Sequence, residues 1–126
     1  MQDSQPIWVV DDDEDDQFLI GIALQEIIPL RSIKFLSNGE ELLMGLAQTT
    51  HPPKLVLLDL RLTYQTGLDI LQTLRTLPAY QHLSVVMLTT CLTPDEEHRA
   101  YQLGAQAIFI KENGFLDVVE MIRPLL

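Results

Sequence analysis

The sequence predicts a doubly wound α/β fold, with a five-stranded parallel sheet and helices on both of its faces. Two observations lead to this prediction. Five short apolar runs alternate with five segments whose apolar residues recur at helical spacing. The connections between them are short, and successive strand and helix units then require parallel strands joined by right-handed crossovers. At 126 residues, the chain has the length of a single domain.

The first unit begins with Ile7–Val10, an apolar, β-branched run that stops at the acidic stretch 11–16. This pattern is typical of a buried strand that ends in a loop. A helix is expected over 16–28, where the acidic residues at its start suit the helix dipole and Pro29 ends it. The apolar residues expected to form its face are Phe18, Ile22, Leu24, Ile27 and Ile28.

The second unit pairs the strand Ile33–Leu36 with a helix over 40–48, and the third pairs a strand over 55–58 with a helix over 67–77. The third strand is apolar on both faces and ends at Asp59, as a central strand of a parallel sheet would. The leucines expected to face inward from these helices are Leu42, Leu43, Leu46, Leu68, Leu71 and Leu74.

The last two units are a strand over 85–88 with a helix over 94–103, and the strand Ala107–Ile110 with a helix over 115–125. Their strands end at Thr89 and Lys111, respectively. Gly104 is expected to cap the first of these helices, because a helix often ends in a residue with positive φ.

Polar side chains follow four of the five predicted strands: Asp11, Asp12, Asp59, Thr89 and Lys111. In doubly wound folds the ligand site lies at the carboxyl ends of the strands, so these side chains should converge. Three carboxylates at one edge would repel one another unless a cation lay among them. A hard divalent ion resolves this, and Mg²⁺ suits a site that also coordinates phosphate.

A carboxylate can attack phosphorus when the charge that develops on the phosphoryl oxygens is shared by a metal, an ammonium and a hydroxyl. Asp59 ends a central buried strand and is the natural acceptor of a phosphoryl group. Each residue alone also has a simpler interpretation: 11–16 as a solvated acidic loop, Asp59 as a helix N-cap, Lys111 as a surface lysine and Thr89 as an ordinary strand residue. Their combination at one edge favours the functional interpretation.

The charge balance argues against nucleic acid and acidic membranes as partners. The formal net charge is −10, and only 8 Lys and Arg residues are present. Cys91 is the single cysteine, so no intrachain disulfide can form, and neither a signal-peptide pattern nor an apolar run of about 18 residues occurs. We therefore expect a cytoplasmic protein. Without metal-ligand spacing, the histidines are expected at the surface: His51, His82 and His98.

Together these motifs resemble the receiver domain of two-component response regulators, of the single-domain chemotaxis-regulator kind, over essentially the whole chain. The matching segments are Val9-Val10-Asp11-Asp12, Leu57-Leu58-Asp59-Leu60 followed by Gly67, Leu88-Thr89-Thr90 and Ile110-Lys111. Their spacing also agrees, because Thr89 follows Asp59 by 30 residues and Lys111 follows Thr89 by 22. Each match alone is weak, but all of them occur in order and at strand ends.

The resemblance implies a flavodoxin-like sheet with strand order 2-1-3-4-5 and one receiver domain over residues 1–126. It implies that Asp59 accepts a phosphoryl group, with Mg²⁺, from the phosphohistidine of a histidine kinase or a phosphotransfer protein. Autodephosphorylation would be slow, and the chain would not be a conventional enzyme. A downstream protein target would dock on the face formed by 94–125, and we expect a monomer or a weak homodimer.

The resemblance also implies a role for each site residue. Asp12 and Asp59 would bind Mg²⁺ directly, Asp11 would bind it through water, and the backbone carbonyl of Arg61 would supply a further ligand. Lys111 would bind a phosphoryl oxygen. Thr89 would move toward another phosphoryl oxygen, and phosphorylation would favour one of two existing states.

Several positions depart from the family pattern. Thr63 replaces a proline, so the loop 61–66 is expected to be less rigid. Glu112 replaces the proline after the lysine, and because a non-proline cis peptide costs about 2.5 to 4 kcal/mol, we expect a trans Lys111–Glu112 bond. Ile108 replaces the aromatic reporter of the switch, and Phe109 should point to the opposite face.

Arg61 and Cys91 lie two residues beyond Asp59 and Thr89, beside the route of attacking water. Arg61 would either shield the phosphoryl group or occupy its site by pairing with a carboxylate. The sequence leaves both arrangements open, and Cys91 is expected to be a bystander.

Two other functions are also open. An aspartate-nucleophile phosphatase uses a similar strand-terminal Asp, Mg²⁺ and Lys, but Asp15 occupies the position where that class has Thr or Val, and no length remains for a substrate cap. The other is a receiver-like interaction module that is never phosphorylated. It would account for Glu112 and Ile108, which stand where the family has a proline and an aromatic residue.

Overall fold

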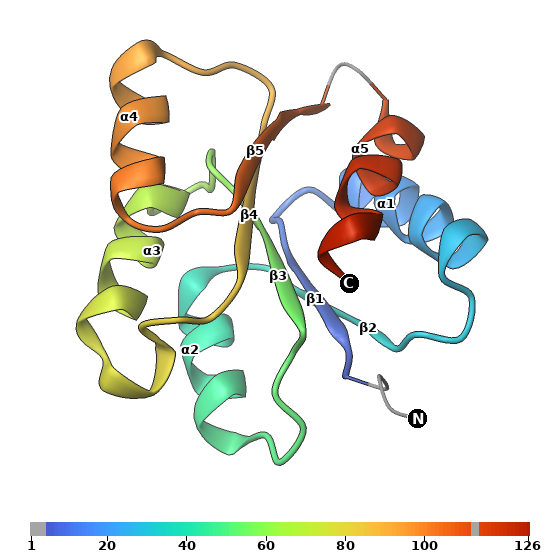
Figure 1. Ribbon diagram of the computed structural model, residues 1–126, viewed down its shortest axis with the longest axis horizontal. Coiled ribbons are helices and arrows are strands. Elements are labelled where there is room, and N and C mark those ends of the chain that lie inside the picture. Colours follow the sequence, from blue (N-terminus) through green and yellow to red (C-terminus); the bar gives the residue numbers. More distant parts are fainter. Residues whose placement is uncertain (1–4, 112–113) are drawn as a thin grey trace.

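The computed structural model describes residues 5–111 and 114–126, in which strands and helices alternate along the chain (Figure 1). The strands are β1 Ile7–Val10, β2 Ile33–Leu36, β3 Leu55–Asp59, β4 Val85–Thr89 and β5 Ala107–Ile110. The helices are α1 Glu14–Ile27, α2 Gly39–Gln48, α3 Gly67–Thr76, α4 Pro94–Gln102 and α5 Phe115–Ile122. Short 3₁₀ helices, η1 Pro78–Tyr80 and η3 Arg123–Leu125, follow α3 and α5. The last predicted helix, over 115–125, is therefore α-helical up to Ile122 and 3₁₀ from Arg123.

The described strands form one parallel sheet in the order β2-β1-β3-β4-β5. Helices α1 and α5 cover one face, and α2, α3 and α4 cover the other (Figure 1). The predicted doubly wound architecture and strand order are therefore confirmed. None of the helices in the described residues combines the length and the apolar character that a membrane span requires.

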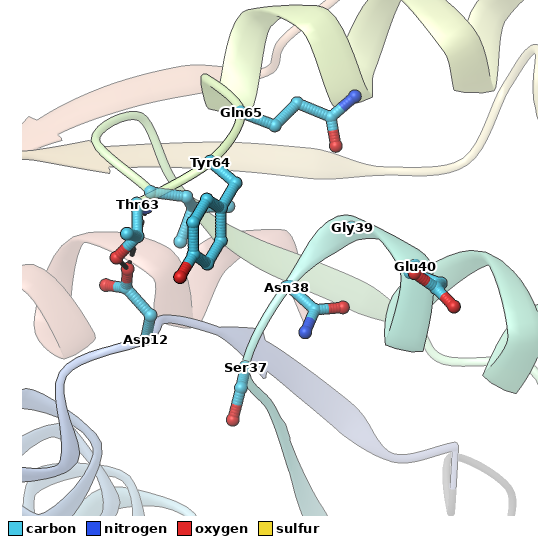
Figure 2. Close-up of a pocket in the computed structure, with 9 residues that line it drawn as sticks. Asp12, Ser37, Asn38, Gly39, Glu40, Thr63, Tyr64 and Gln65 are labelled. Atoms are coloured by element: carbon cyan, nitrogen blue, oxygen red, sulfur yellow. Dashed lines mark hydrogen bonds between the residues drawn. The ribbon is translucent and has the colours of Figure 1, made fainter.

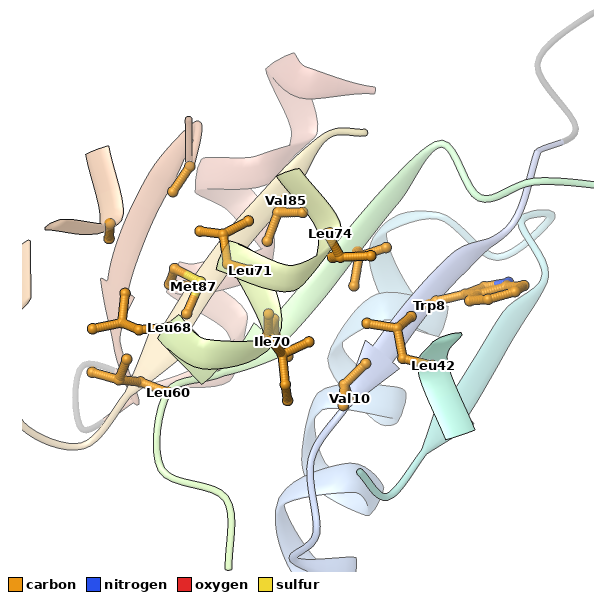
Figure 3. Close-up of a cluster of buried hydrophobic side chains, with 14 of the residues drawn as sticks. Trp8, Val10, Leu42, Leu60, Leu68, Ile70, Leu71, Leu74, Val85 and Met87 are labelled. Atoms are coloured by element: carbon orange, nitrogen blue, oxygen red, sulfur yellow. The ribbon is translucent and has the colours of Figure 1, made fainter. Parts of the chain in front are cut away.

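Two apolar clusters hold the helices against the sheet. Side chains alternate along β1, so that Trp8 and Val10 join the cluster beneath α2, α3 and α4, while Ile7 and Val9 join the one beneath α1 and α5. Figure 3 shows α3 packed onto the first cluster through its buried leucines, which are Leu68, Leu71 and Leu74, as predicted. Each fully buried leucine contributes roughly 1.5 to 3 kcal/mol to folding.

The register of the sheet brings the strand ends to one edge. Val10 pairs with Leu58, Asp59 pairs with Leu88, and Thr89 pairs with Ile110. The residues that follow these pairs therefore leave the sheet side by side, although they are up to 100 positions apart in the chain. This edge is where the sequence places the site.

Side chains cap α1 and α4, which both begin near this edge. Asp13 caps α1 and accepts hydrogen bonds from the amides of Asp15 and Asp16, at 2.8 and 3.1 Å. Thr93 and Glu96 form a reciprocal capping box at the start of α4. Gly104, just beyond α4, has a φ of 82°, the left-handed conformation expected of its predicted capping role.

The inward face of α1 matches the prediction in part: Leu24 is buried, and Ile27 and Ile28 pack against the same apolar cluster. Ile20, Ala23 and Leu24 are buried, whereas Phe18 and Ile22 are exposed. The buried positions follow the spacing i, i+3, i+4. Phe18 and Ile22 are each two residues from Ile20, which places them on the opposite side of the helix. Apolar residues on both sides of a helix do not reveal which side packs on the sheet.

Replacing Gly67 with alanine should disturb the segment that carries Asp59. A Cβ at Gly67 would lie 2.4 Å from the backbone carbonyl oxygen of Asp59 and 2.9 Å from the Cα of Leu60, neither of which can move alone. We expect Gly67→Ala to lower the free energy of unfolding by about 1 to 3 kcal/mol, measured by urea denaturation.

Gly21→Ala is the matched control, because its added Cβ would meet the ring tip of the exposed Phe35 at 3.0 Å. Alanine is the better helix former, so we expect this variant to be as stable as the wild type or more so. Equal losses in the two variants would contradict the assigned role of Gly67.

Candidate functional site

The polar residues predicted from the strand ends converge in the structure. In the described part of the chain, the buried charged or hydroxyl side chains are Asp11, Asp59, Thr89 and Lys111. The Nζ atom of Lys111 lies 2.8 Å from Oδ2 of Asp11 and 3.2 Å from Oδ2 of Asp59. A buried ammonium thus joins two buried carboxylates across the ends of three strands.

The other oxygen of each buried carboxylate is held by the backbone. Oδ1 of Asp11 accepts a hydrogen bond from the amide of Asp13 at 3.0 Å, and Oδ1 of Asp59 accepts one from the amide of Arg61 at 3.1 Å. These bonds fix the direction of both carboxylates.

Asp12 completes the acidic cluster from the exposed side. Its Oδ2 accepts hydrogen bonds from both the amide of Thr63, at 2.8 Å, and the hydroxyl of Thr63. Figure 2 shows these two residues facing each other at the wall of a neighbouring cavity of about 360 Å³. Proline lacks an amide hydrogen and a hydroxyl, so Thr63 supplies contacts to Asp12 that the residue expected from the family cannot make.

The three aspartates can coordinate one cation. Asp11, Asp12 and Asp59 each offer a carboxylate oxygen, and these atoms all lie within 4.8 Å of one another. Ligands about 2.1 Å from a shared octahedral ion would be separated by roughly 3 to 4 Å, so a small adjustment would bring them to one Mg²⁺. An all-oxygen donor set fits Mg²⁺, Mn²⁺ or Ca²⁺ better than a softer metal.

Asp16 belongs to the site but was not predicted from the sequence. Its Oδ2 lies 2.7 Å from Nζ of Lys111, which makes it a third carboxylate on the ammonium. The signal was present, since Asp16 is in the first turn of α1 and four residues beyond Asp12. The acidic stretch was interpreted as a partner of the helix dipole, which did not distinguish Asp16 from its neighbours.

Burial and charge shift the protonation equilibria of the site. Burial, together with the nearby Asp11 carboxylate, raises the pKa of Asp59 to about 6, although Lys111 acts in the opposite direction. Burial opposes the charge of Lys111, but its hydrogen bonds to Asp11 and Asp16 raise its pKa above the ordinary value. Lys111 therefore stays positively charged while Asp59 is the carboxylate that a proton can neutralise.

Thr89 is buried at the end of β4, and its hydroxyl is turned toward its own loop. The hydroxyl donates a hydrogen bond to the carbonyl of Cys91 at 2.6 Å and accepts one from the amide of Cys91 at 3.3 Å.

Ile108 packs with the cluster beneath α2, α3 and α4, and Phe109 packs with the opposite cluster, as predicted.

The remaining predictions have mixed outcomes. The side chain of Arg61 pairs with a carboxylate, that of Glu96 on α4, at 2.7 Å. Whether Arg61 shields a phosphoryl group on Asp59 stays a prediction. The Lys111–Glu112 bond lies outside the described residues. Cys91 is exposed. The histidines are exposed as predicted: His51, His82 and His98.

Comparisons with known proteins, by sequence and by structure, point to one family. A family model described as the response regulator receiver domain matches residues 7–123. Response regulator Rcp1 of Synechocystis sp. is 26% identical over 129 residues, which cover 94% of this chain and 84% of that protein. The Mn²⁺-bound form of Rcp1 superposes with a TM-score of 0.80 at 25% identity, covering 96% of this chain and 91% of that one.

A probable cyclic di-GMP phosphodiesterase of Vibrio cholerae is 31% identical over 99 residues, which cover 79% of this chain. The matched region is only 21% of that protein. This chain therefore corresponds to about a fifth of one relative and to most of another.

The raised pKa of Asp59 predicts how stability changes with pH in the absence of divalent metal. Between pH 3.8 and about 6 the folded state binds more protons at Asp59 than the unfolded state does, so stability should fall as pH rises through this window. We expect the wild type to lose roughly 1 to 3 kcal/mol relative to Asp59→Asn between pH 4 and pH 7, measured by urea unfolding in a chelator. Adding Mg²⁺ should offset this loss in the wild type only.

Asp69→Asn is the control, since it removes an exposed carboxylate from α3. Parallel curves of stability against pH for the wild type and Asp59→Asn would contradict the assigned protonation of Asp59.

Proposed function

Because the chain belongs to the response regulator receiver family, we propose that it accepts a phosphoryl group on Asp59 from the phosphohistidine of a histidine kinase or a phosphotransfer protein. The observation that carries this proposal is the buried contact of the Lys111 ammonium with Asp59, at 3.2 Å, beside two further aspartates that can share a cation. The charges needed for phosphoryl transfer are thus present at one carboxylate.

In the proposed reaction, a carboxylate oxygen of Asp59 forms a bond to phosphorus while the bond between phosphorus and the imidazole nitrogen of the donor breaks. The imidazole takes up a proton and leaves, and Asp59 becomes an acyl phosphate. The ammonium of Lys111 is within reach of a phosphoryl oxygen and would share its negative charge.

The metal fits the same arrangement. When bound, Mg²⁺ would supply positive charge beside the phosphoryl oxygens. We assign Asp12 and Asp59 as its direct ligands, Asp11 as a ligand through water, and the backbone carbonyl of Arg61 as a further ligand. The Mn²⁺-bound form of the relative Rcp1 supports a divalent ion in this fold.

Signalling would begin when Thr89 leaves the Cys91 carbonyl for a phosphoryl oxygen. Ile108 stands in place of an aromatic reporter. The conformational change would therefore pass through the loop before α4 rather than through the rotation of an aromatic side chain. We propose one cytoplasmic receiver domain over 1–126 that signals to a protein target through 94–125. Its charge of −10 disfavours direct contact with nucleic acid.

Phosphorylation can be tested with a small phosphodonor. We expect acetyl phosphate with Mg²⁺ to add one labile phosphoryl group to the wild type, detected by intact-protein mass spectrometry. Asp59→Asn should abolish the adduct, Lys111→Met should slow its formation at least tenfold, and a chelator should prevent it. Asp69→Asn, which alters an exposed carboxylate outside the site, should react like the wild type.

An adduct that persists in Asp59→Asn would refute Asp59 as the acceptor. If the wild type stayed unmodified at any donor concentration, a receiver-like interaction module would account better for the chain.

A further inference from the structure

Arg61 stands between the phosphoryl site and helix α4. Its backbone amide binds Oδ1 of Asp59, and Arg61 is among the residues that line a cavity of about 170 Å³, together with Asp59, Thr90 and Lys111. A phosphoryl group on Asp59 would occupy this cavity. Arg61 therefore borders the space in which new negative charge would appear.

The guanidinium of Arg61 makes its contacts on the side of α4. Its Nη2 lies 2.7 Å from Oε1 of Glu96, 3.4 Å from the carbonyl oxygen of Cys91 and 3.7 Å from the Cys91 Sγ. The same Cys91 carbonyl accepts the hydroxyl of Thr89. Arg61 and Thr89 thus share one acceptor in the loop between β4 and α4.

Glu96 links this contact to the start of α4. Its Oε1 also accepts the amide of Thr93 at 3.0 Å, while its own amide donates to the Thr93 hydroxyl at 3.2 Å. One carboxylate oxygen therefore holds both the cap of α4 and the guanidinium of Arg61. If Arg61 left, Glu96 would keep its bond to Thr93.

The contact between Arg61 and Glu96 is weak enough to exchange. Their side chains are 40% and 20% exposed, and ion pairs in such positions contribute little to stability. A phosphoryl group offers more negative charge than a carboxylate, and its oxygens match the planar fork of a guanidinium. The two partners of Arg61 thus compete, and phosphorylation would shift the balance.

We propose, on the basis of the function proposed above, that Arg61 exchanges Glu96 for a phosphoryl oxygen on Asp59 and so couples phosphorylation to the start of α4. Arg61 contacts the phosphoryl group, and Glu96 is a positioning residue that acts through Arg61. As Arg61 and Thr89 both leave the Cys91 carbonyl, the loop before α4 loses two of its attachments. Phosphorylation also leaves the Glu96 carboxylate without its positive partner at the surface of α4.

The exchange can be measured as binding of a phosphoryl mimic, beryllium fluoride with Mg²⁺, by isothermal titration calorimetry. Glu96→Gln removes the competing charge but keeps an acceptor for the cap, since glutamine serves in a capping box. We expect it to bind the mimic about two- to fivefold more tightly than the wild type. Arg61→Gln should bind it at least twofold more weakly, and Arg61→Lys should fall between Arg61→Gln and the wild type.

The double variant decides the mechanism. If Glu96 acts through Arg61, then Arg61→Gln with Glu96→Gln should bind the mimic as Arg61→Gln does alone. Glu97→Gln is the matched control, because it removes the same charge from the next, exposed position of α4 and should bind like the wild type. Urea unfolding of each variant separates these effects from damage to the α4 cap.

Equal affinities for Glu96→Gln and Glu97→Gln, or an unchanged effect of Glu96→Gln when Arg61 is absent, would overturn the exchange while leaving Asp59 as the acceptor. Failure of the wild type to bind the mimic at all would instead overturn the proposed function, and the exchange with it.

Discussion

The buried ammonium of Lys111 is the contact on which the rest of the site depends. It lies within 3.2 Å of carboxylate oxygens from Asp11, Asp16 and Asp59, which would otherwise repel one another in a region shielded from water. Asp12 adds a fourth carboxylate at the rim, so one ammonium leaves the cluster with an excess of negative charge. That excess is what a divalent cation would neutralise. In the proposed function, Asp59 would accept a phosphoryl group only when such positive charge is present.

The parallel sheet makes this contact possible. Strands β1, β3 and β5 deliver Asp11, Asp59 and Lys111 to a common edge because their registers align at their carboxyl ends. The two apolar clusters fix the strands from both faces, and Gly67 lets α3 start against the backbone of Asp59. The carboxylates are thus held by buried contacts, whereas partly exposed side chains make the contacts of the loop before α4.

Much of this arrangement could be predicted from the sequence. Strand ends follow from apolar runs that stop abruptly, and a parallel sheet places such ends together, so Asp11, Asp59, Thr89 and Lys111 could be assigned to one edge. The pairings between loops could not be assigned. Apolar periodicity indicates the packed face of a helix but not which acidic side chain at its start turns toward the site, so Asp16 was missed. Arg61 was expected near the phosphoryl site, but its partner on α4 depends on a tertiary contact 35 residues away. Phe18 and Ile22 were assigned to the inward face of α1 because apolar residues occur on both sides of this helix.

The most direct measurement of the central claim is anomalous X-ray diffraction from crystals grown with Mn²⁺, which replaces Mg²⁺ at oxygen sites and scatters anomalously. Our interpretation predicts one Mn²⁺ bonded to carboxylate oxygens of Asp12 and Asp59, with Asp11 just beyond bonding distance and Lys111 on the far side of Asp59. A fully occupied ion elsewhere on the acidic surface, or no ion beside Asp59 at saturating Mn²⁺, would contradict it.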